Sequence, residues 1–400
     1  MEIKYFDHAA TTPVRDEVIK EMILYLGVQF GNASAMYSIG RKAKRAMNNA
    51  REKVANVLNC DINEVYFTSC GSESDNLAIK GFAYANKEKG NHIITSKIEH
   101  HAVLNSCQSL EKQGFRITYL NVDENGVVDL QELKNSITPE TILITIMYAN
   151  NEIGTIEPIN HIGQIAKQKN IVFHTDAVQA IGNIKIDVKK SNIDMLSLSG
   201  HKFYAPKGIG ALYVKDGINF MKLQDGGEQE MNKRAGTENI AEIVGMGKAI
   251  ELIYNELDDY NNKLRELRDY YFSEIKRNIK DIKINGDLTN RLPGNASVSF
   301  KGINGSELLF KLDEYGICAS AGSTCMTANP EPSHVLTAIG LEKEFINGTL
   351  RTSFGRCNTK QDIDYLVKKL TEIIKWKNAK QIEKKRKTKK NKYKMDFIRK

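Results

Sequence analysis

Residues 193–202 read Ile193-Asp194-Met195-Leu196-Ser197-Leu198-Ser199-Gly200-His201-Lys202, and the rest of the chain is best understood from this stretch. An apolar run ends in a turn of small residues, which predicts a buried strand followed directly by a loop. Lys202 therefore lies where a desolvated amine could form a Schiff base. Most lysines are solvated surface charges, so the remaining sequence has to show whether this one differs.

The length and composition are those of an ordinary folded protein. The 400 residues, 41% of them hydrophobic, are enough for one large and one smaller domain, each with its own core. No stretch approaches the roughly 18 uninterrupted apolar residues of a membrane span, and the first residues lack the pattern of a signal peptide. The six scattered cysteines form no CxxC pair, which argues against a disulfide framework and a structural zinc site. We expect a cytoplasmic protein without a membrane partner.

The formal net charge of +8 arises from an excess of basic residues at the C-terminal end of the chain. Residues 377–400 hold 12 of the 57 Lys and Arg residues and two of the 49 Asp and Glu residues, so residues 1–376 carry 45 basic and 47 acidic side chains. We interpret this tail as a disordered or loosely helical appendage. It is either a solvated solubility tail or a contact for an acidic protein or RNA, and nucleic acid is expected as a partner only through it.

From Val65 onward one unit recurs: a short apolar strand, a turn of small or polar residues, and a helix. The strands are expected at residues 65–68, 93–95, 142–146, 171–173 and 195–198. Unbroken apolar strands separated by helices predict a mostly parallel sheet covered on both faces. Before this region we expect two covering helices, one starting at Pro13 with Thr12 as its cap and ending near Leu26, the other over residues 38–58. Ligands of such sheets bind beyond the carboxyl ends of the strands.

Chemically useful side chains follow each of these strands. Gly71 and Ser72 open a helix, where N–H groups, a hydroxyl and the helix dipole suit a phosphate, although a plain serine cap gives the same pattern. His100 could stack on an aromatic ligand or simply be hydrogen bonded, and Asn151 offers an amide donor. Asp176 would be costly to bury without a cationic partner. Together with a Schiff-base lysine, these groups describe a site for pyridoxal 5′-phosphate (PLP), with the aspartate paired to the pyridine nitrogen.

Several motifs make the chain similar to a known family. They are YFDHAATTP (residues 5–13), the stretch 68–81, EH (99–100), NNEIG (150–154), HTDAVQ (174–179), SGHK (199–202) and RAGT (234–237). Over residues 3–375 the chain resembles the class V, fold-type I PLP enzymes, and specifically the cysteine desulfurases of the NifS and IscS type. The resemblance implies an α/β fold with a mostly parallel, seven-stranded sheet covered by helices in a large domain, and a smaller α+β C-terminal domain. It also implies a homodimer with PLP as its cofactor.

The resemblance gives the site residues their roles. Lys202 is the Schiff-base lysine, and His100 stacks on the cofactor ring and carries a proton. Asp176 pairs with the pyridine nitrogen, while Asn151 and Gln179 contact the side of the ring that bears the hydroxyl. The phosphate is held by Gly71, Ser72, Ser199 and His201, with Thr237 reaching the phosphate of the neighbouring subunit.

The C-terminal third is expected to form the smaller domain. A long helical stretch over residues 238–278 leads into it, and its elements are expected at 296–300 (strand), 306–315 (helix), 350–354 (strand) and a closing helix whose apolar face includes Ile363 to Ile374. The predicted division is an N-terminal arm (1–15) leading into the small domain and the covering helices, a large PLP-binding domain (16–255), the small domain (256–376) and the basic tail (377–400).

Cys325 and Arg351 are the candidates that select the reaction. Residues 319–329 are mostly small or polar, which describes a mobile loop with the Cys325 thiol at its centre; a packed structural cysteine is the alternative. The resemblance makes Cys325 the sulfur-receiving nucleophile and Arg351, with Asn151, the site of the substrate carboxylate, a role for which Arg356 is the rival. It implies that L-cysteine gives L-alanine and a persulfide on Cys325, whose sulfur passes to an acceptor such as an iron–sulfur scaffold protein. No metal site is expected, apart from a transient contact between Cys325 and an iron–sulfur cluster.

Three alternatives fit the same residues. A selenocysteine lyase or an aminotransferase of this fold would use the same cofactor site, with Cys325 selecting selenium or being incidental. A scaffold or RNA-binding protein would act through the basic tail and would have a degenerate cofactor site. Detection of a persulfide, a keto acid or no cofactor absorbance distinguishes these functions.

Overall fold

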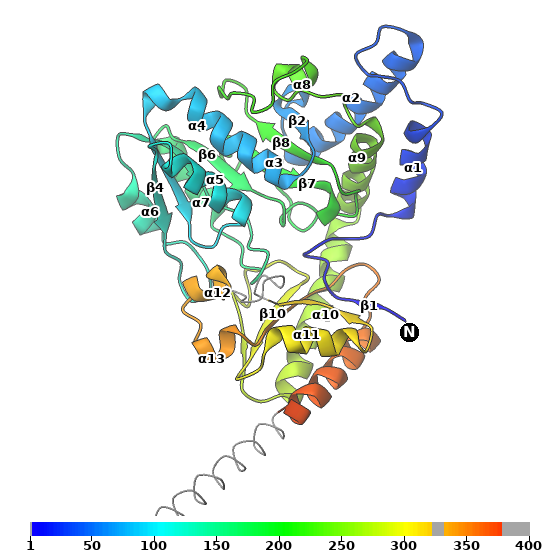
Figure 1. The fold of residues 1–400 in the computed structure, drawn as a ribbon, viewed down its shortest axis with the longest axis vertical. Coiled ribbons are helices and arrows are strands. Elements are labelled where there is room, and N and C mark those ends of the chain that lie inside the picture. The colour runs from blue at the N-terminus through cyan, green and yellow to red at the C-terminus, as the bar shows by residue number, and fades with distance from the viewer. Residues whose placement is uncertain (1, 322–331, 378–400) are drawn as a thin grey trace, which may run out of the picture.

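A seven-stranded sheet forms the centre of the upper half of the molecule in Figure 1. The computed structural model describes residues 2–321 and 332–377. The strands, in spatial order, are β2 (Val65–Thr68), β8 (Gly210–Val214), β7 (Met195–Ser199), β6 (Val172–Asp176), β5 (Thr141–Thr145), β3 (His92–Ser96) and β4 (Arg116–Leu120). All are parallel except β8, which runs antiparallel between β2 and β7. The predicted α/β class with a mostly parallel seven-stranded sheet is confirmed.

Helices cover both faces of this sheet, and alternate strand residues contribute to the two faces. Ile94 and Ile144 pack in one core, whereas Ile93 and Leu143 pack in another. The first core includes residues of α2 (Ser38–Leu58), α6 (Leu130–Ser136), α7 (Ile159–Gln168) and α9 (Ile240–Asn255). The second includes residues of a π-helical turn (Leu77–Gly81), α4 (Phe82–Ala85) and α5 (His101–Glu111); the turn and α4 continue the helical run that begins after β2 with α3 (Gly71–Asn76). Burial on both faces explains why the strands read as unbroken apolar runs.

Of the two predicted N-terminal helices, one has the predicted bounds and the other begins later than predicted. Helix α2 has the predicted bounds and ends at Asn59, whose left-handed backbone (φ 57°) returns its N–H to the last turn. Helix α1 (Asp16–Leu26) begins later than predicted. Thr12 does not cap it, because the Thr12 hydroxyl donates to the carbonyl of His201 at 2.9 Å and accepts from the N–H of Tyr204 at 2.8 Å. The Thr12 side chain therefore ties the N-terminal arm to the turn that carries Lys202.

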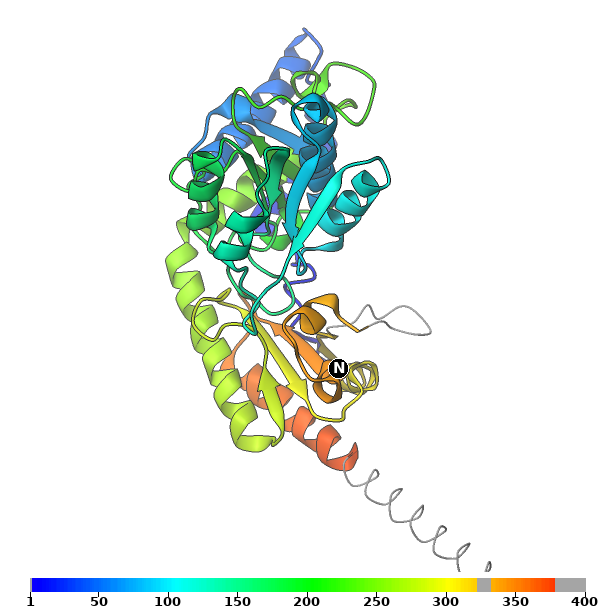
Figure 2. The same cartoon turned by 90° about the vertical axis from the view of Figure 1, so that its left-hand side faces the viewer.

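The lower half of Figure 1 is built on an antiparallel sheet, and Figure 2 shows α10 (Leu257–Asn278) descending along one side to reach it. The strands, in spatial order, are β12 (Ser320–Ala321), β13 (Thr349–Ser353), β10 (Asn295–Phe300) and β9 (Ile282–Ile284). The other elements are α8 (Gln229–Asn232) in the upper half, and α11 (Gly305–Asp313), α12 (His334–Ala338), α13 (Lys343–Ile346) and a helix over residues 360–377 in the lower half.

The N-terminal arm belongs to the lower half. Strand β1 (Lys4–Tyr5) pairs in parallel with β11 (Ile317–Cys318), and Phe6 is buried in the lower core against the ring of Phe354. The predicted helical stretch over residues 238–278 consists of two helices, α9 and α10, which meet at Glu256, whose carboxylate pairs with Arg15. The core of the upper half and the core of the lower half are separate, which agrees with a large and a small domain. The predicted domain boundary at residue 255 stays a prediction. No helix within the described residues is long and apolar enough to cross a membrane.

Candidate active site

A cavity of about 340 Å³ opens at the carboxyl ends of the parallel strands, where the sheet faces the lower half of the molecule. The sequence-predicted residues that line it are Gly71, Ser72, His100, Asn151, Asp176, Gln179, Ser199, His201, Lys202 and Arg351. A larger cavity of about 550 Å³ lies at the opposite ends of β5 and β6 and contains none of the predicted residues. The residues that were selected by the rule that ligands bind beyond the carboxyl ends of parallel strands therefore line one cavity.

Lys202 follows β7 in a single 3₁₀ turn, Gly200–Lys202. Its Nζ donates to the carbonyl oxygens of Ala9 and Ala10 on the N-terminal arm, at 2.7 and 2.8 Å. Burial, followed by the positive charge of Arg351, lowers the pKa of Lys202 to about 8, although Asp176 and Asp7 oppose the shift. With this pKa roughly a tenth of the amines are neutral at pH 7, far more than for an ordinary lysine, and the neutral form is the one that acts as nucleophile or proton acceptor.

Asp176 ends β6 and is 5% exposed. One carboxylate oxygen accepts from the N–H of Val178 at 2.9 Å, and burial raises the pKa of the side chain while the charges of His100 and Lys202 lower it. Asp75 also lines the cavity, is 1% exposed, and has an Oδ1 without a hydrogen-bond partner. Burial and then the charge of Asp176 raise the pKa of Asp75. Two buried carboxyl groups at one end of the cavity favour a cationic ligand group between the strands and the first helix.

The helix after β2 supplies an anion site. Cys70 at its N-cap makes no side-chain cap, so the first N–H groups of the helical run that continues to Ala85 are left for a ligand. A Cβ atom on Gly71 would lie 2.6 Å from Cγ2 of Val178, closer than real Cβ contacts come. Gly71 thus keeps the backbone open beside the buried Ser199, and a phosphate suits this corner of the cavity.

His100 and Asn151 reach the cavity from neighbouring strand ends. The Nδ1 atom of His100 accepts from the N–H of Ala102 at 3.1 Å, which caps α5 and leaves the ring exposed on the cavity side. Desolvation by the surrounding walls of the cavity lowers the pKa of His100, the charge of Asp176 opposes this shift and that of Lys202 adds to it, so the neutral ring is favoured. Asn150 is fully buried and its side chain bonds the turn residues Glu152 and Ile153 at 2.8 and 3.0 Å, which orients the adjacent Asn151.

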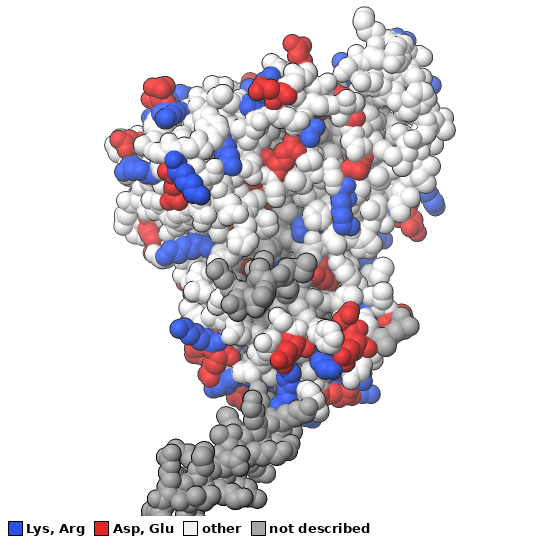
Figure 3. Space-filling view, viewed as in Figure 1, with Lys and Arg blue, Asp and Glu red and all other residues white. Residues whose placement is uncertain are grey.

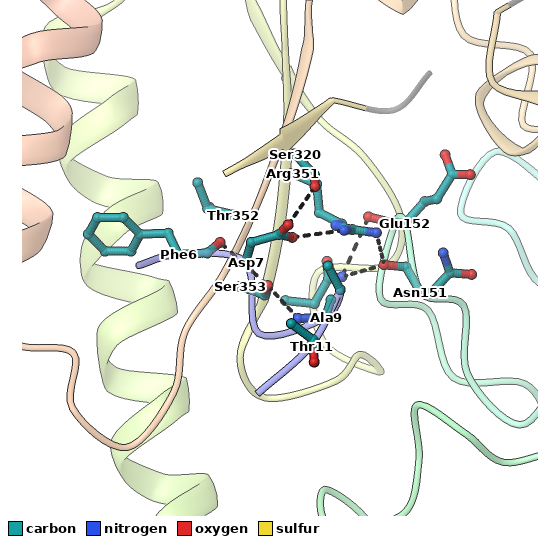
Figure 4. Close-up of polar contacts among 12 residues, drawn as sticks. Phe6, Asp7, Ala9, Thr11, Asn151, Glu152, Ser320, Arg351, Thr352 and Ser353 are labelled. Carbon is teal, nitrogen blue, oxygen red and sulfur yellow. Dashed lines mark hydrogen bonds and ion pairs between the residues drawn. The ribbon is translucent and has the colours of Figure 1, made fainter. Parts of the chain in front are cut away.

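Arg351 comes from β13 in the lower half and lines the cavity from that side. Its Nη2 pairs with a carboxylate oxygen of Asp7 at 2.9 Å, and its Nη1 donates to the carbonyl of Asn151 at 3.3 Å (Figure 4). Arg356, the rival from sequence, pairs with Glu256 at 3.5 Å and does not line the cavity. A guanidinium and a lysine amine that line one cavity can bind a small amino acid through its carboxylate.

One further predicted residue, Thr237, does not line this cavity, and another lies outside the part of the chain that the structure describes. Thr237 is exposed and lies on the surface of the upper half, and Cys325 is outside the described residues. Sequence reasoning missed Asp75 and Asp7. Asp75 follows Gly71 by four residues and so shares its helix face, which is a signal that could have been read; Asp7 has no such signal, because its partner Arg351 is 344 residues away.

Comparison with known proteins gives a consistent result. The family model described as aminotransferase class-V matches residues 4–366. A "Cysteine desulfurase IscS" of Clostridium botulinum is 56% identical over 373 residues, which are 93% of this chain and 94% of that protein. A solved "NifS-like protein" superposes with a TM-score of 0.89 at 38% identity, over 94% of this chain and 100% of the other. A structure described as "SspA in complex with cysteine" superposes with a TM-score of 0.75 at 40% identity, over 88% and 99% of the two chains.

Proposed function

Since the chain belongs to the aminotransferase class-V family and is a cysteine desulfurase of the NifS and IscS type, we propose that its cavity binds PLP and L-cysteine and that Cys325 receives the sulfur. The observation that carries this proposal is the meeting of Lys202, Asp176 and the Gly71 turn in one cavity, with Arg351 opposite. The similarity to desulfurases over nearly the whole chain does not favour an aminotransferase, a selenocysteine lyase or a non-enzymatic scaffold.

The residues present fit PLP. The hydrogen bonds of the Lys202 amine go to two backbone carbonyls, so a carbonyl compound can react with it without breaking an ion pair. Asp176 is buried at the far wall, where the protonated pyridine nitrogen would compensate its charge. The uncapped helix start and the room beside Gly71 suit the phosphate. We infer that Ser72, Ser199 and His201 complete the phosphate site, that His100 stacks on the ring, and that Asn151 and Gln179 contact its hydroxyl side.

When bound, PLP supplies an electron sink that makes the bonds of an attached amino acid easier to break. The chain's own residues then do the rest. Arg351 would hold the substrate carboxylate, Lys202 would move the proton at the α-carbon, and His100 would carry a proton for the substrate thiol. The Cys325 thiolate would bond to the substrate sulfur as the C–S bond breaks, and the carbon skeleton would take up protons to leave as L-alanine. L-cysteine and one enzyme thiol thus give L-alanine and one enzyme persulfide, and no external oxidant is needed.

We also infer a homodimer, which would bring Thr237 to the phosphate of the neighbouring site. Helix α1 and the loop after it expose apolar side chains, among them Ile23 (57% exposed), Val28 (80%) and Phe30 (70%). This surface, at the upper right of Figure 3, shows few charged side chains. Ala33 and Ser34 line a cavity together with residues of the 228–238 segment, so the apolar surface adjoins the loop that leads to Thr237. Sedimentation of the purified protein at the mass of a dimer would agree with this inference.

The acceptor of the sulfur is inferred from the family alone. A protein that takes a persulfide sulfur, such as an iron–sulfur scaffold, and a cytoplasmic location remain proposals. Mixing the persulfide-loaded enzyme with candidate acceptors and following the labelled sulfur tests the acceptor directly.

The function is tested with purified variants and labelled L-cysteine. Cys325→Ala should keep the yellow absorbance of bound PLP and form neither alanine nor sulfide, while Lys202→Ala should lose that absorbance. Cys357→Ala is the matched control, because Cys357 is an exposed free thiol away from the cavity, and it should keep the wild-type rate. Sulfide release by Cys325→Ala at the wild-type rate would overturn the role of Cys325.

A further inference from the structure

Asp7 has a place in the site that the proposed function does not use. Its carboxylate takes two hydrogen bonds, one from Nη2 of Arg351 at 2.9 Å and one from the hydroxyl of Ser320 at 2.8 Å (Figure 4). The two side chains of the ion pair are only 11% and 15% exposed. The backbone of Asp7 is fixed as well, because its carbonyl accepts from the N–H of Ala10 at 2.9 Å and the residue forms an isolated parallel β-bridge with Ser353. Because of these contacts, the Asp7 carboxylate keeps its position when Arg351 also binds a ligand.

The arrangement leaves suitable donors free on Arg351. A guanidinium has five N–H groups, two on each terminal nitrogen and one on Nε. Asp7 uses one on Nη2 and the carbonyl of Asn151 uses one on Nη1, at 3.3 Å. One N–H therefore remains on each terminal nitrogen, and the Nε–H has no hydrogen-bond partner either. The two protein contacts restrict the rotation of the guanidinium, and a carboxylate can accept from two N–H groups of one guanidinium at once.

Asp7 could instead compete with the substrate for Arg351, but its location argues against this. Arg351 lines the cavity, whereas Asp7 is not among the residues that line it. The Asp7 carboxylate thus contacts the guanidinium from outside the cavity, and a ligand can reach Arg351 without displacing it. Its negative charge also offsets the repulsion between Arg351 and Lys202, whose pKa Asp7 raises and Arg351 lowers.

We propose that Asp7 is a positioning residue that sets the selectivity of the site for amino acids with a free α-carboxylate, by fixing the guanidinium of Arg351 at the wall of the cavity while N–H groups stay available for the ligand. This inference rests on the proposed role of Arg351 in binding the substrate carboxylate. It predicts that loss of the Asp7 charge weakens carboxylate recognition specifically, and leaves the binding of the cofactor and of the amino group unchanged.

The test compares two ligands of the PLP-loaded enzyme by the absorbance change on binding: L-alanine, and L-alaninamide, in which an amide replaces the carboxylate. In Asp7→Asn, the preference for L-alanine over L-alaninamide should fall about tenfold or more, since hydrogen bonds between charged groups are stronger than neutral ones. The KM for L-cysteine should rise by a similar factor, with a smaller change in kcat. Asp362→Asn is the matched control, because Asp362 pairs with Lys4 of the same arm at 2.8 Å and does not line the cavity; it should leave the preference unchanged.

Other results would overturn the proposal. Equal weakening of both ligands in Asp7→Asn would show a merely structural role, and tighter binding of L-alanine would show that Asp7 competes with the substrate. Arg351→Ala separates this proposal from the proposed function. If Arg351→Ala abolishes the preference and Asp7→Asn does not change it, only the role of Asp7 fails; if Arg351→Ala leaves it unchanged, the carboxylate site itself is elsewhere. In the Arg351→Ala background, Asp7→Asn should have no further effect on the preference.

Discussion

Replacing Glu230 by Gln should strongly destabilise the upper half of the protein, because it breaks a buried ion pair. Both carboxylate oxygens of Glu230 accept from Arg51, each at 2.7 Å, and one also accepts from the N–H of Phe67 at 2.7 Å. The two side chains are 3% and 7% exposed. The glutamine keeps the shape of the side chain but removes the charge that compensates the buried guanidinium.

The size of the effect follows from this burial. Breaking one partner of a buried pair costs about 3–5 kcal/mol, since the remaining charge stays without compensation, whereas exposed pairs contribute about 1 kcal/mol or less. We expect a loss of about 3 kcal/mol, because the glutamine oxygen can still accept one hydrogen bond. Asp258→Asn is the matched control: Asp258 pairs with Lys185 at 2.6 Å, but the two side chains are 75% and 67% exposed.

Hydrogen exchange reports on this loss at the site itself. The Phe67 amide donates to Glu230, so peptides that cover β2 should lose protection roughly 150-fold in Glu230→Gln, which is the exchange equivalent of about 3 kcal/mol. Asp258→Asn should leave the same peptides unchanged. Protection of β2 within about fivefold of the wild type, equivalent to about 1 kcal/mol, would refute the reasoning.

Three further predictions concern buried groups of the large sheet. Burial raises the pKa of Glu157 to about 8, so the folded protein holds a proton there that the unfolded chain releases above about pH 4.5. The stability of the wild type should therefore fall as the pH rises from about 4.5 to about 8. In urea titrations at pH 5.5 and 7.5, Glu157→Gln should gain about 1.4 kcal/mol of stability per pH unit relative to the wild type. The rate at which the apoenzyme takes up PLP should rise with pH and level off above about pH 8, the pKa of Lys202, and Arg351→Gln should move the midpoint upward because a charge that lowers this pKa is gone. Gly71→Ala should weaken PLP binding about tenfold in a spectroscopic titration, because the new Cβ meets Val178 at 2.6 Å, and adding Val178→Ala should restore it.

The repeated strand, turn and helix pattern predicted most of the large sheet, because burial on both faces gives its strands an unbroken apolar sequence. Helix α2 could be predicted to the residue from its apolar spacing, since one of its faces packs in the core against α9. Strands β8 and β4 were missed: β8 returns antiparallel after a turn with no α-helix between it and β7, and β4 is an edge strand whose residues are mostly only half-buried. The predicted helical stretch over residues 238–278 did not specify the break at Glu256, where the carboxylate pairs with Arg15 and Arg356, both distant in sequence.

The part of the site that the large sheet contributes could be predicted from the order of its strands. Residues at successive strand ends, from Gly71 to Lys202, meet because parallel strands end at the same edge. The contribution of the lower half came only from the family resemblance, which singled out Arg351. Contacts of the N-terminal arm with Lys202 and Arg351 had no local signal, since they form only when the two halves and the arm pack together.

The N-terminal arm has a consequence for how the enzyme is made. The carbonyls that hold Lys202 and the carboxylate that holds Arg351 belong to the first ten residues of the chain, while Arg351 leaves the ribosome some 340 residues later. Pairings between segments so far apart form late in folding, because closing long loops costs conformational entropy first. The large sheet can therefore fold during synthesis while the amine and the carboxylate site are still unassembled. A nascent or truncated chain would then be unable to process cysteine, and sulfur chemistry would begin only in a completed molecule.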